Sequence, residues 1–222
     1  MSGEGVIKFR SEHQACALPA YRYGKLCCKL SAWREVMAKT QLVGQDPARY
    51  GGAGYGNVSG RIGAPAVARG ARSMLITGSQ TSGLPTISLQ HYCVVQRYDY
   101  DRSWVASEGQ IEPSSETMTH GAIYDLSPAI RFVLHAHSPT IWRLAKELRL
   151  PLSDPAVAYG TPEMAREVHR LYVSSTLSQT RIFAMGGHED GVVVFGYTIE
   201  EAGQALISCL AKAYELICCR IG

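Results

Sequence analysis

Short runs of apolar residues alternate along this chain with longer segments in which apolar positions recur at helical spacing. Runs of this length, rich in Val, Ile, Phe and Tyr and flanked by turn residues, are typical of buried strands. The predicted strands cover residues 74–76, 92–95, 130–134, 182–184 and 192–195. Because strands and helices mix without strict β-α-β alternation, the pattern favours a layered α/β/α fold with a mixed sheet over a doubly wound parallel one.

Helices are expected where a hydroxyl side chain precedes helical spacing, since Ser and Thr are good N-caps. Proline follows the cap at two of these sites, and Glu201 stands three residues after Thr198, as in a capping box. The expected helices begin at Ser31, within 113–116, at Ser138, at Thr161 and at Thr198, and those with a readable end finish near Val43, Leu126, Leu177 and Cys218.

The first 30 residues show no clean periodicity. We therefore expect an irregular N-terminal extension over residues 1–30, followed by a single domain over residues 31–222. A chain of 222 residues is long enough for one domain with a full hydrophobic core. Residues 4–9 would cover either a functional site or a subunit interface, and the sequence leaves that choice open.

Composition and charge narrow the range of partners. The net charge is only +3 with histidines neutral, and Lys and Arg form no cluster, so no nucleic-acid partner is expected. No apolar run approaches the roughly 20 residues that a membrane span needs, and the first residues lack the apolar core of a signal peptide. Seven cysteines without a C-x-x-C spacing indicate buried thiols in a reducing compartment. We therefore expect a cytoplasmic protein without membrane contact.

Two histidines stand one residue apart at the end of the apolar run 130–134. In an extended backbone, side chains at i and i+2 point to the same face, so His135 and His137 would direct two imidazoles toward one point. Neutral imidazole is a common ligand of zinc and other first-row divalent ions, although one buried and one exposed histidine would give the same pattern. A metal site needs a further ligand. His188, in a glycine-flanked turn between the last two predicted strands, is the best third candidate.

Glu116 follows two serines at a predicted helix start. A carboxylate beside a metal can act as a ligand or as a general acid and base, although Glu at a helix N-terminus is also a common stabilising residue. Ser114 and Ser115 would serve either as caps or, with backbone N–H groups, as ligands of an anion.

The order of these motifs resembles that of the class II aldolase/adducin family. The matching segments are 56–61 (Gly-Asn-Val-Ser-Gly-Arg), 76–78 (Ile-Thr-Gly), 113–116 (Pro-Ser-Ser-Glu), 135–137 (His-Ala-His) and the histidine turn that ends at Gly191. The likeness spans about residues 31 to 217. It implies a three-layer α/β/α sandwich with a central mixed, mostly antiparallel sheet, and a homotetramer with active sites between subunits.

The same resemblance implies roles for individual residues. His135, His137 and His188 would bind the metal, with Glu116 as the acid and base that touches it. The metal would be Zn²⁺ or another divalent ion such as Mn²⁺, Co²⁺, Ni²⁺ or Fe²⁺. The residues that would help to hold a small-molecule substrate are Asn57, Thr77, Gly78, Ser114 and Ser115.

Three features depart from the family pattern. The loop over residues 77–83 is longer and richer in hydroxyl groups than the family's turn, which suits either a phosphate or a neutral group. Glu189 and Asp190 follow the third histidine, and we expect them to be exposed loop residues rather than partners of its ring. The connection before Thr161 is short, which leaves Tyr159 either as a replacement for the family's catalytic tyrosine or as a packed aromatic residue.

These observations predict a divalent-metal-dependent lyase of the class II aldolase type, acting in carbohydrate metabolism. By the resemblance, it would cleave or form a carbon–carbon bond of a small hydroxylated carbonyl compound through a metal-stabilised enediolate. The alternatives are an epimerase, dehydratase or decarboxylase of the same fold, and a non-catalytic adducin-like binding module. Fold alone does not choose among them, because function resides in the site.

Overall fold

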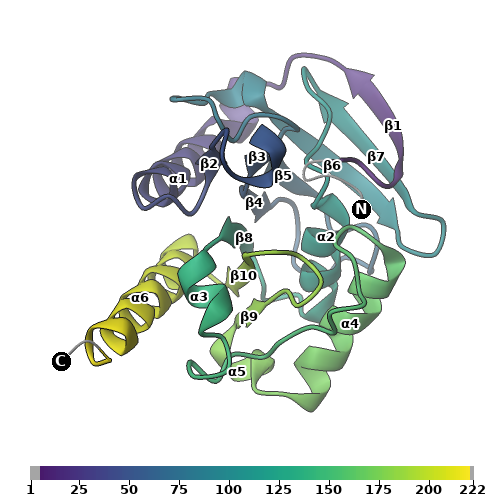
Figure 1. The fold of residues 1–222 in the computed structure, drawn as a ribbon. Helices are drawn as coiled ribbons and strands as arrows, with labels where there is room; N and C mark the ends of the chain where they lie inside the picture. Colours follow the sequence, from purple (N-terminus) through teal and green to yellow (C-terminus); the bar gives the residue numbers. More distant parts are fainter. Residues whose placement is uncertain (1–5, 221–222) are drawn as a thin grey trace.

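One eight-stranded sheet organises the part of the chain that the computed structural model describes, residues 6–220 (Figure 1). The strands lie in the order β1-β7-β6-β5-β4-β8-β10-β9, and every neighbouring pair is antiparallel except β1 and β7. Their bounds are β1 Arg10–Ala15, β4 Asn57–Arg61, β5 Met74–Thr77, β6 Tyr92–Asp99, β7 Trp104–Gly109, β8 Phe132–His137, β9 Ile182–Ala184 and β10 Gly191–Gly196, and a separate ribbon pairs β2 Gly44–Gln45 with β3 Gly54–Tyr55.

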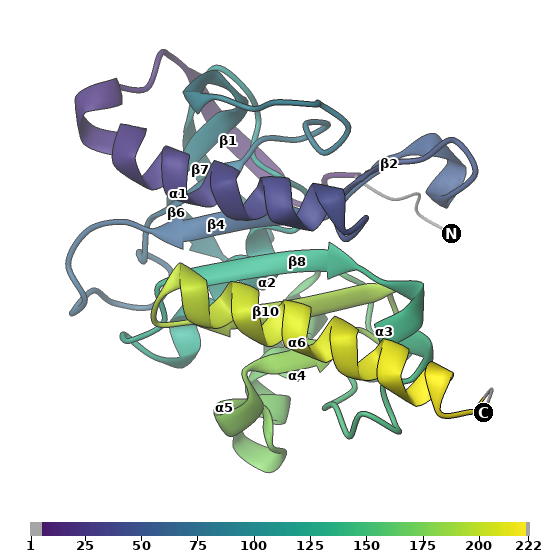
Figure 2. The same cartoon turned by 90° about the vertical axis from the view of Figure 1, so that its left-hand side faces the viewer.

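Helices cover both faces of this sheet. α1 and α6 lie side by side against one face, and α2 and α4 cover the opposite face (Figures 1 and 2). The helices are α1 Ala20–Lys39, α2 Thr117–Leu126, α3 Pro139–Arg143, α4 Pro162–Ser174, α5 Leu177–Thr180 and α6 Ile199–Cys218, with single 3-10 turns at η1 Tyr50–Gly52 and η2 Leu89–His91. The predicted fold class, three layers around a mixed, mostly antiparallel sheet, is confirmed.

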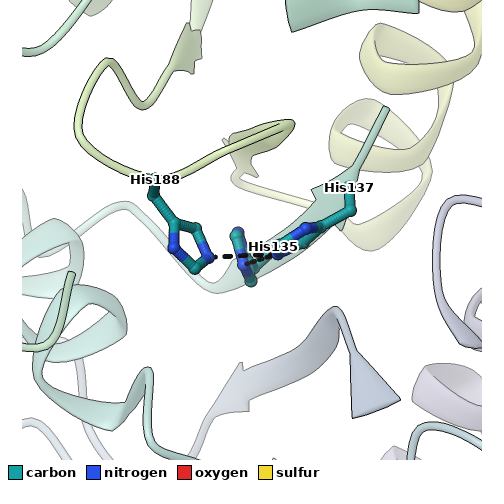
Figure 3. A group of neighbouring side chains, drawn as sticks. All are labelled: His135, His137 and His188. Atoms are coloured by element: carbon teal, nitrogen blue, oxygen red, sulfur yellow. Dashed lines mark hydrogen bonds between the residues drawn. The ribbon is translucent and has the colours of Figure 1, made fainter. Parts of the chain in front are cut away.

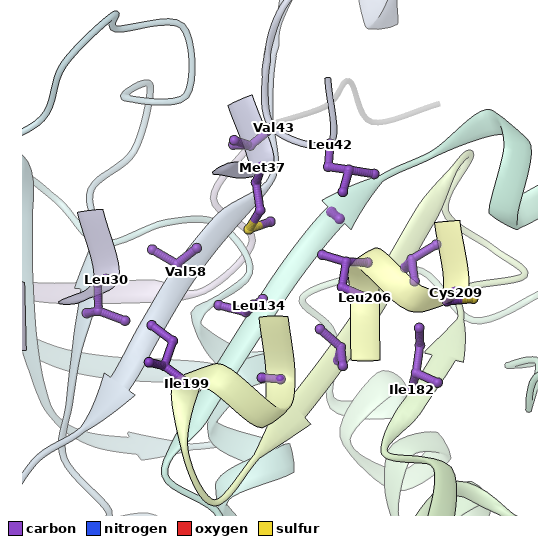
Figure 4. Packing of buried hydrophobic residues seen from close by; sticks show 14 of the residues in the cluster. Leu30, Met37, Leu42, Val43, Val58, Leu134, Ile182, Ile199, Leu206 and Cys209 are labelled. Atoms are coloured by element: carbon purple, nitrogen blue, oxygen red, sulfur yellow. The ribbon is translucent and has the colours of Figure 1, made fainter. Parts of the chain in front are cut away.

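Each face of the sheet has its own apolar core. On the first face, Leu30 of α1 and Leu206 of α6 belong to one buried cluster with Val58 and Leu134 of the central strands (Figure 4). Alternate residues of a strand point to opposite faces, so Val133 of β8 belongs to the other core, beneath α2 and α4. The same alternation sends the remaining odd-numbered residues of β8 to the α2 side.

Three of the predicted helix starts carry the expected caps. The hydroxyls of Ser138, Thr161 and Thr198 each accept a hydrogen bond from the backbone N–H three residues on, at 3.2, 3.3 and 3.1 Å. The carboxylate of Glu201 accepts a hydrogen bond from the backbone N–H of Tyr197 at 3.0 Å. In a capping box it would instead accept from the N–H of the N-cap residue, Thr198. The predicted capping box is therefore only half formed.

The N-terminal region differs from the expectation of irregular structure. Residues 10–15 form β1 at the sheet edge, and α1 begins at Ala20, so the predicted boundary at residue 30 and the predicted cap Ser31 fall inside a helix. The N-cap of α1 is Pro19, which has no side-chain hydroxyl. The sequence analysis located helix starts by a hydroxyl side chain at the N-cap, and α1 has no such side chain at its first residue. Glu4 and Gly5 lie outside the described residues.

The cysteines are free thiols, but the prediction that they are buried holds only in part. Cys27, Cys93 and Cys209 are buried, and Cys16 is half-buried. The prediction is wrong for the remaining three, which are exposed: Cys28, Cys218 and Cys219. Between residues 6 and 220, no helix is long and apolar enough to cross a membrane.

Candidate active site

The central strand β8 carries the two paired histidines. His135 and His137 share the parity of Val133, so both imidazoles point to the face that α2 covers. Both are fully buried. The expectation that the two rings point toward one place is confirmed, and the alternative of one buried and one exposed histidine is excluded.

The turn between β9 and β10 brings in the third histidine. The Nε2 atom of His135 lies 3.1 Å from that of His137, which in turn lies 3.0 Å from that of His188. The three ligand atoms lie within 4.8 Å of one another (Figure 3). Three imidazoles from two sequence-distant segments thus converge on one buried point.

Close backbone packing shapes this turn. A Cβ atom on Gly186 would lie 2.2 Å from the carbonyl oxygen of Ser153, and one on Gly187 would lie 2.2 Å from that of Val157. Such approaches leave no room for a side chain. The two glycines therefore allow the segment before α4 to press against the turn and hold His188 in place.

The donor set fits a divalent metal ion. Burial lowers the pKa of His135 to about 4 and holds the pKa values of His137 and His188 well below their usual range. All three rings are then neutral at physiological pH, which is the form that binds metals. Tetrahedral nitrogen ligands at 2.0–2.1 Å from zinc are about 3.3 Å apart, close to the 3.1 Å between His135 and His137 and the 3.0 Å between His137 and His188.

Glu116 lies beside the three imidazoles. It is the N-cap residue of α2, a position that the sequence argument assigned to one of the two serines before it, and its side chain makes no capping bond. Its Oε1 atom lies 3.7 Å from Nε2 of His188. Within residues 6–220, neither carboxylate oxygen has a hydrogen-bond partner. Burial raises the pKa of Glu116 to about 7, a value suited to a group that both accepts and donates protons.

A small polar pocket collects most of the predicted substrate-binding residues. Asn57 pairs in register with His135 across β4 and β8, and its Oδ1 atom is buried without a hydrogen-bond partner among the described residues. Four of the predicted residues line it: Asn57, Gly78, Ser114 and Ser115. The rest of the lining is Ser79, Gln80 and Ser82, from the loop 77–83 that the sequence analysis considered for a phosphate or a neutral group, and the glycines Gly54 and Gly56, to which it gave no role.

Thr77 stands apart from this pocket. It is buried in β5, its hydroxyl accepts a hydrogen bond from the N–H of Val58 at 3.2 Å, and its carbonyl oxygen accepts one from the N–H of Ser114. The hydroxyl that was expected to help hold the substrate thus contacts the backbone of β4, and the backbone carbonyl of Thr77 contacts the serine turn.

Tyr159 lies against the metal-binding group. Its ring is buried, with its centroid 4.4 Å from that of His188. The ring is therefore packed, as one of the two alternatives expected, and it packs on a candidate metal ligand; replacement of the family's catalytic tyrosine stays a prediction.

The loop before β3 supplies residues that the sequence argument missed. The ring of Tyr50 packs edge-on against His137 with centroids 4.7 Å apart, and its hydroxyl donates to Asp190 at 2.7 Å. Arg49 lies 3.9 Å from the same carboxylate. Asp190 is buried, so the expectation that it is exposed is wrong, whereas Glu189 is exposed as expected. The network ties the loop to the turn that carries the third histidine.

We expect Tyr50→Phe to weaken metal binding about tenfold, because residues that hold ligands in place typically contribute 10–100-fold to metal affinity. The variant keeps the ring against His137 and loses the two hydrogen bonds of the hydroxyl, the one that it donates to Asp190 and the one that it accepts from Arg49. Competition with a chelator measures the affinity. Tyr21→Phe is the matched control, since Tyr21 is 93 % exposed. Equal affinity in both variants would show that the loop does not support the site.

Comparisons with known proteins agree with this geometry. Residues 46–217 match the family model described as Class II Aldolase and Adducin N-terminal domain. The methylthioribulose-1-phosphate dehydratase of Hahella chejuensis (strain KCTC 2396) is 26 % identical to this chain over 159 residues, which cover 61 % of this chain and 75 % of that protein.

Solved structures share the fold. The L-fuculose-1-phosphate aldolase from Thermus thermophilus superposes with a TM-score of 0.63 at 18 % identity, covering 89 % of this chain and 95 % of that one. A sugar-phosphate aldolase from Thermotoga maritima gives a TM-score of 0.62 at 14 % identity, with 88 % and 95 % covered. Because the family model spans most of the chain, including all three histidines and Glu116, this protein belongs to the class II aldolase and adducin N-terminal domain family.

Proposed function

We propose that this protein is a divalent-metal-dependent lyase of the class II aldolase type that acts on a small hydroxylated carbonyl compound. One observation carries the proposal: three buried, neutral imidazoles converge beside a buried carboxylate that has no hydrogen-bond partner among the described residues. A purely structural module has no need to bury a carboxylate, which costs folding free energy.

In this proposal His135, His137 and His188 hold the ion, with zinc as the first candidate and Mn²⁺, Co²⁺, Ni²⁺ and Fe²⁺ as others. When bound, the metal would supply Lewis-acid polarisation of a substrate carbonyl. Glu116 accepts a proton from the substrate in its ionised form and returns it in its protonated form. A pKa of about 7 makes both forms available near neutral pH.

The polar pocket would hold the substrate's hydroxyl or phosphate oxygens. Ser114 and Ser115 lie just before the N-terminus of α2, where backbone N–H groups favour an anion. Asn57 and Gly78 line the facing side. Tyr159 would serve as a second proton donor from the His188 side. By its likeness to the family, we further propose a homotetramer in the cytoplasm, with sites between subunits.

Dehydration is a second candidate, favoured by a specific observation. The chain is 26 % identical over 159 residues to a methylthioribulose-1-phosphate dehydratase. Loss of water needs the same polarised carbonyl and the same proton-transferring carboxylate as carbon–carbon cleavage. It differs in the bond that breaks, between carbon and a hydroxyl group rather than between two carbons.

Product analysis separates these reactions. We expect the zinc-loaded protein to convert either L-fuculose 1-phosphate or methylthioribulose 1-phosphate. Mass spectrometry of the reaction mixture identifies the products. Two carbonyl fragments would indicate aldol cleavage, a single product lighter by one water would indicate dehydration, and an isomer of unchanged mass would indicate epimerisation. No turnover of any hydroxylated carbonyl substrate by a protein that binds metal would contradict the proposal.

A further inference from the structure

A buried arginine of α1 holds the loop over residues 78–84, between β5 and η2. Arg34 is only 3 % exposed. Its Nη2 atom donates hydrogen bonds to the carbonyl oxygens of Ser82 at 2.5 Å and Leu84 at 2.7 Å, and lies 3.4 Å from that of Thr81. The guanidinium therefore gathers the carbonyl groups of the loop on its own side.

The charge of Arg34 has no acidic partner within residues 6–220. The acceptors of its hydrogen bonds are neutral carbonyl groups, and the adjacent Glu35 pairs with Lys39 instead, at 3.6 Å. Burial lowers the pKa of Arg34, yet a guanidinium stays charged at physiological pH. Because an unpaired charge costs more to bury than a neutral donor, a simple tie between α1 and the loop does not explain why the donor is a cation.

The same loop lines the polar pocket of the candidate active site. Arg34 itself is not part of the lining, which includes four residues of the loop: Gly78, Ser79, Gln80 and Ser82. The C=O and N–H groups of a trans peptide point in opposite directions. The carbonyl groups that face Arg34 thus turn the N–H groups of Ser82 and Gly83 away from it.

Backbone N–H groups are the donors that this loop leaves unused. The hydroxyl of Thr81 donates to the carbonyl oxygen of Gly78 at 2.7 Å, and that of Ser82 donates to the carbonyl oxygen of Gly56 at 2.8 Å. Among the described residues, by contrast, the N–H groups of residues 80–83 find no acceptor. Successive free N–H groups suit an anion, and a positive charge behind them strengthens that preference.

We propose that Arg34 is a positioning residue of the polar pocket: it orients the loop's N–H groups and supplies the positive charge that makes the pocket prefer an anionic oxygen to a neutral one. Arg34 acts through the loop and does not touch the ligand. The inference rests on the proposed function in that it concerns the pocket proposed to hold the substrate. Arg34 lies outside residues 46–217, the part of the chain that matches the family model.

Binding of inorganic phosphate to the metal-free protein tests this role, since no metal is then present to hold the anion. Arg34→Gln replaces the cation by a neutral donor, and Arg34→Lys keeps the charge. By calorimetry at low ionic strength, we expect Arg34→Gln to lower phosphate affinity about tenfold, as loss of one unit charge within about 10 Å would, and Arg34→Lys to retain most of it. Arg22→Gln is the matched control, because Arg22 is an exposed arginine of the same helix.

Ser115→Leu locates the bound phosphate, because it places an apolar side chain in the pocket. We expect this variant to lose phosphate binding, and binding that survived would mean that the anion sits elsewhere and would overturn the inference. Equal affinities of Arg34→Gln and Arg34→Lys would also overturn it, since packing of the loop would then account for the arginine. Arg34→Met is a second uncharged variant should Arg34→Gln not fold.

The metal-free measurement separates this inference from the proposed function. If the unsubstituted protein bound no phosphate, the role of Arg34 would be wrong, whatever the metal-loaded protein does. If the metal-loaded protein turned over no hydroxylated carbonyl substrate, the proposed function would be wrong, and the order of phosphate affinities among the Arg34 variants would still decide whether the arginine's charge acts on the pocket.

Discussion

His135→Ala is expected to remove metal binding and, with it, all measurable catalysis. His135 occupies β8 between the other central strands, and its Nε2 atom lies 3.1 Å from that of His137. Three protein ligands are the usual minimum for a catalytic zinc site. Loss of a residue that only supports a metal ligand lowers metal affinity by up to roughly 100-fold. Because this variant loses a ligand itself and keeps only two, we expect a larger fall in affinity. Metal analysis after dialysis measures the loss.

The matched control is His169→Ala on the exposed side of α4. It removes an imidazole of the same kind without touching the site, so its metal content should equal that of the unsubstituted protein. His135→Ala also leaves a small cavity in the core, and circular dichroism should confirm that the fold survives. A folded His135→Ala protein with full metal content would mean that the three histidines are structural and that the enzyme proposal is wrong.

Local periodicity explains why the metal-binding group could be predicted from the sequence. A strand places residues i and i+2 on one face, so the parity of His135 and His137 followed from the apolar run alone. His188 needed only a turn between two strands, and the glycines around it marked that turn. Each of these inferences depends on a few residues that are neighbours in the sequence, and the spacing of such residues determines the directions of their side chains.

Contacts between distant segments could not be predicted in the same way. The burial of Asp190 depends on Tyr50, 140 residues earlier, whose hydroxyl reaches it at 2.7 Å. Lys8 reaches Tyr159 across a comparable distance in sequence. No periodic pattern records such pairs. Polar residues in a glycine-rich loop look exposed until the partner segment is placed against them.

The edge strand β1 illustrates a second limit. Its residues are mostly exposed, with a burial pattern that alternates weakly, so its sequence lacks the apolar run of a buried strand. The strand forms because its backbone pairs in parallel with β7. Backbone hydrogen bonding to a neighbour is nearly independent of side-chain type, which is why edge strands leave a faint signal in the sequence.

Glu116→Gln is expected to lower kcat by about 10²–10⁴-fold, the range for removal of a general acid and base, while the metal stays bound. Gln has nearly the same shape but exchanges no proton, and the three histidines remain intact. Turnover of the substrate identified by product analysis, together with metal content, measures both effects. Glu189→Gln is the control, because Glu189 is an exposed carboxylate next to His188.

The same substitution should stabilise the metal-free protein at high pH. The pKa of Glu116 is about 7 when folded against a usual value of 4.5, so the folded state keeps its proton longer and stability falls as pH rises between these values. At about 1.4 kcal/mol per pKa unit, the cost above pH 7 is about 3 kcal/mol. Thermal unfolding with chelator present should therefore show Glu116→Gln more stable than the unsubstituted protein at pH 8 and similar to it at pH 4. If the two melting curves shifted in parallel with pH, Glu116 would have to be compensated in the folded protein, and its proposed role as a proton carrier would lose its physical basis.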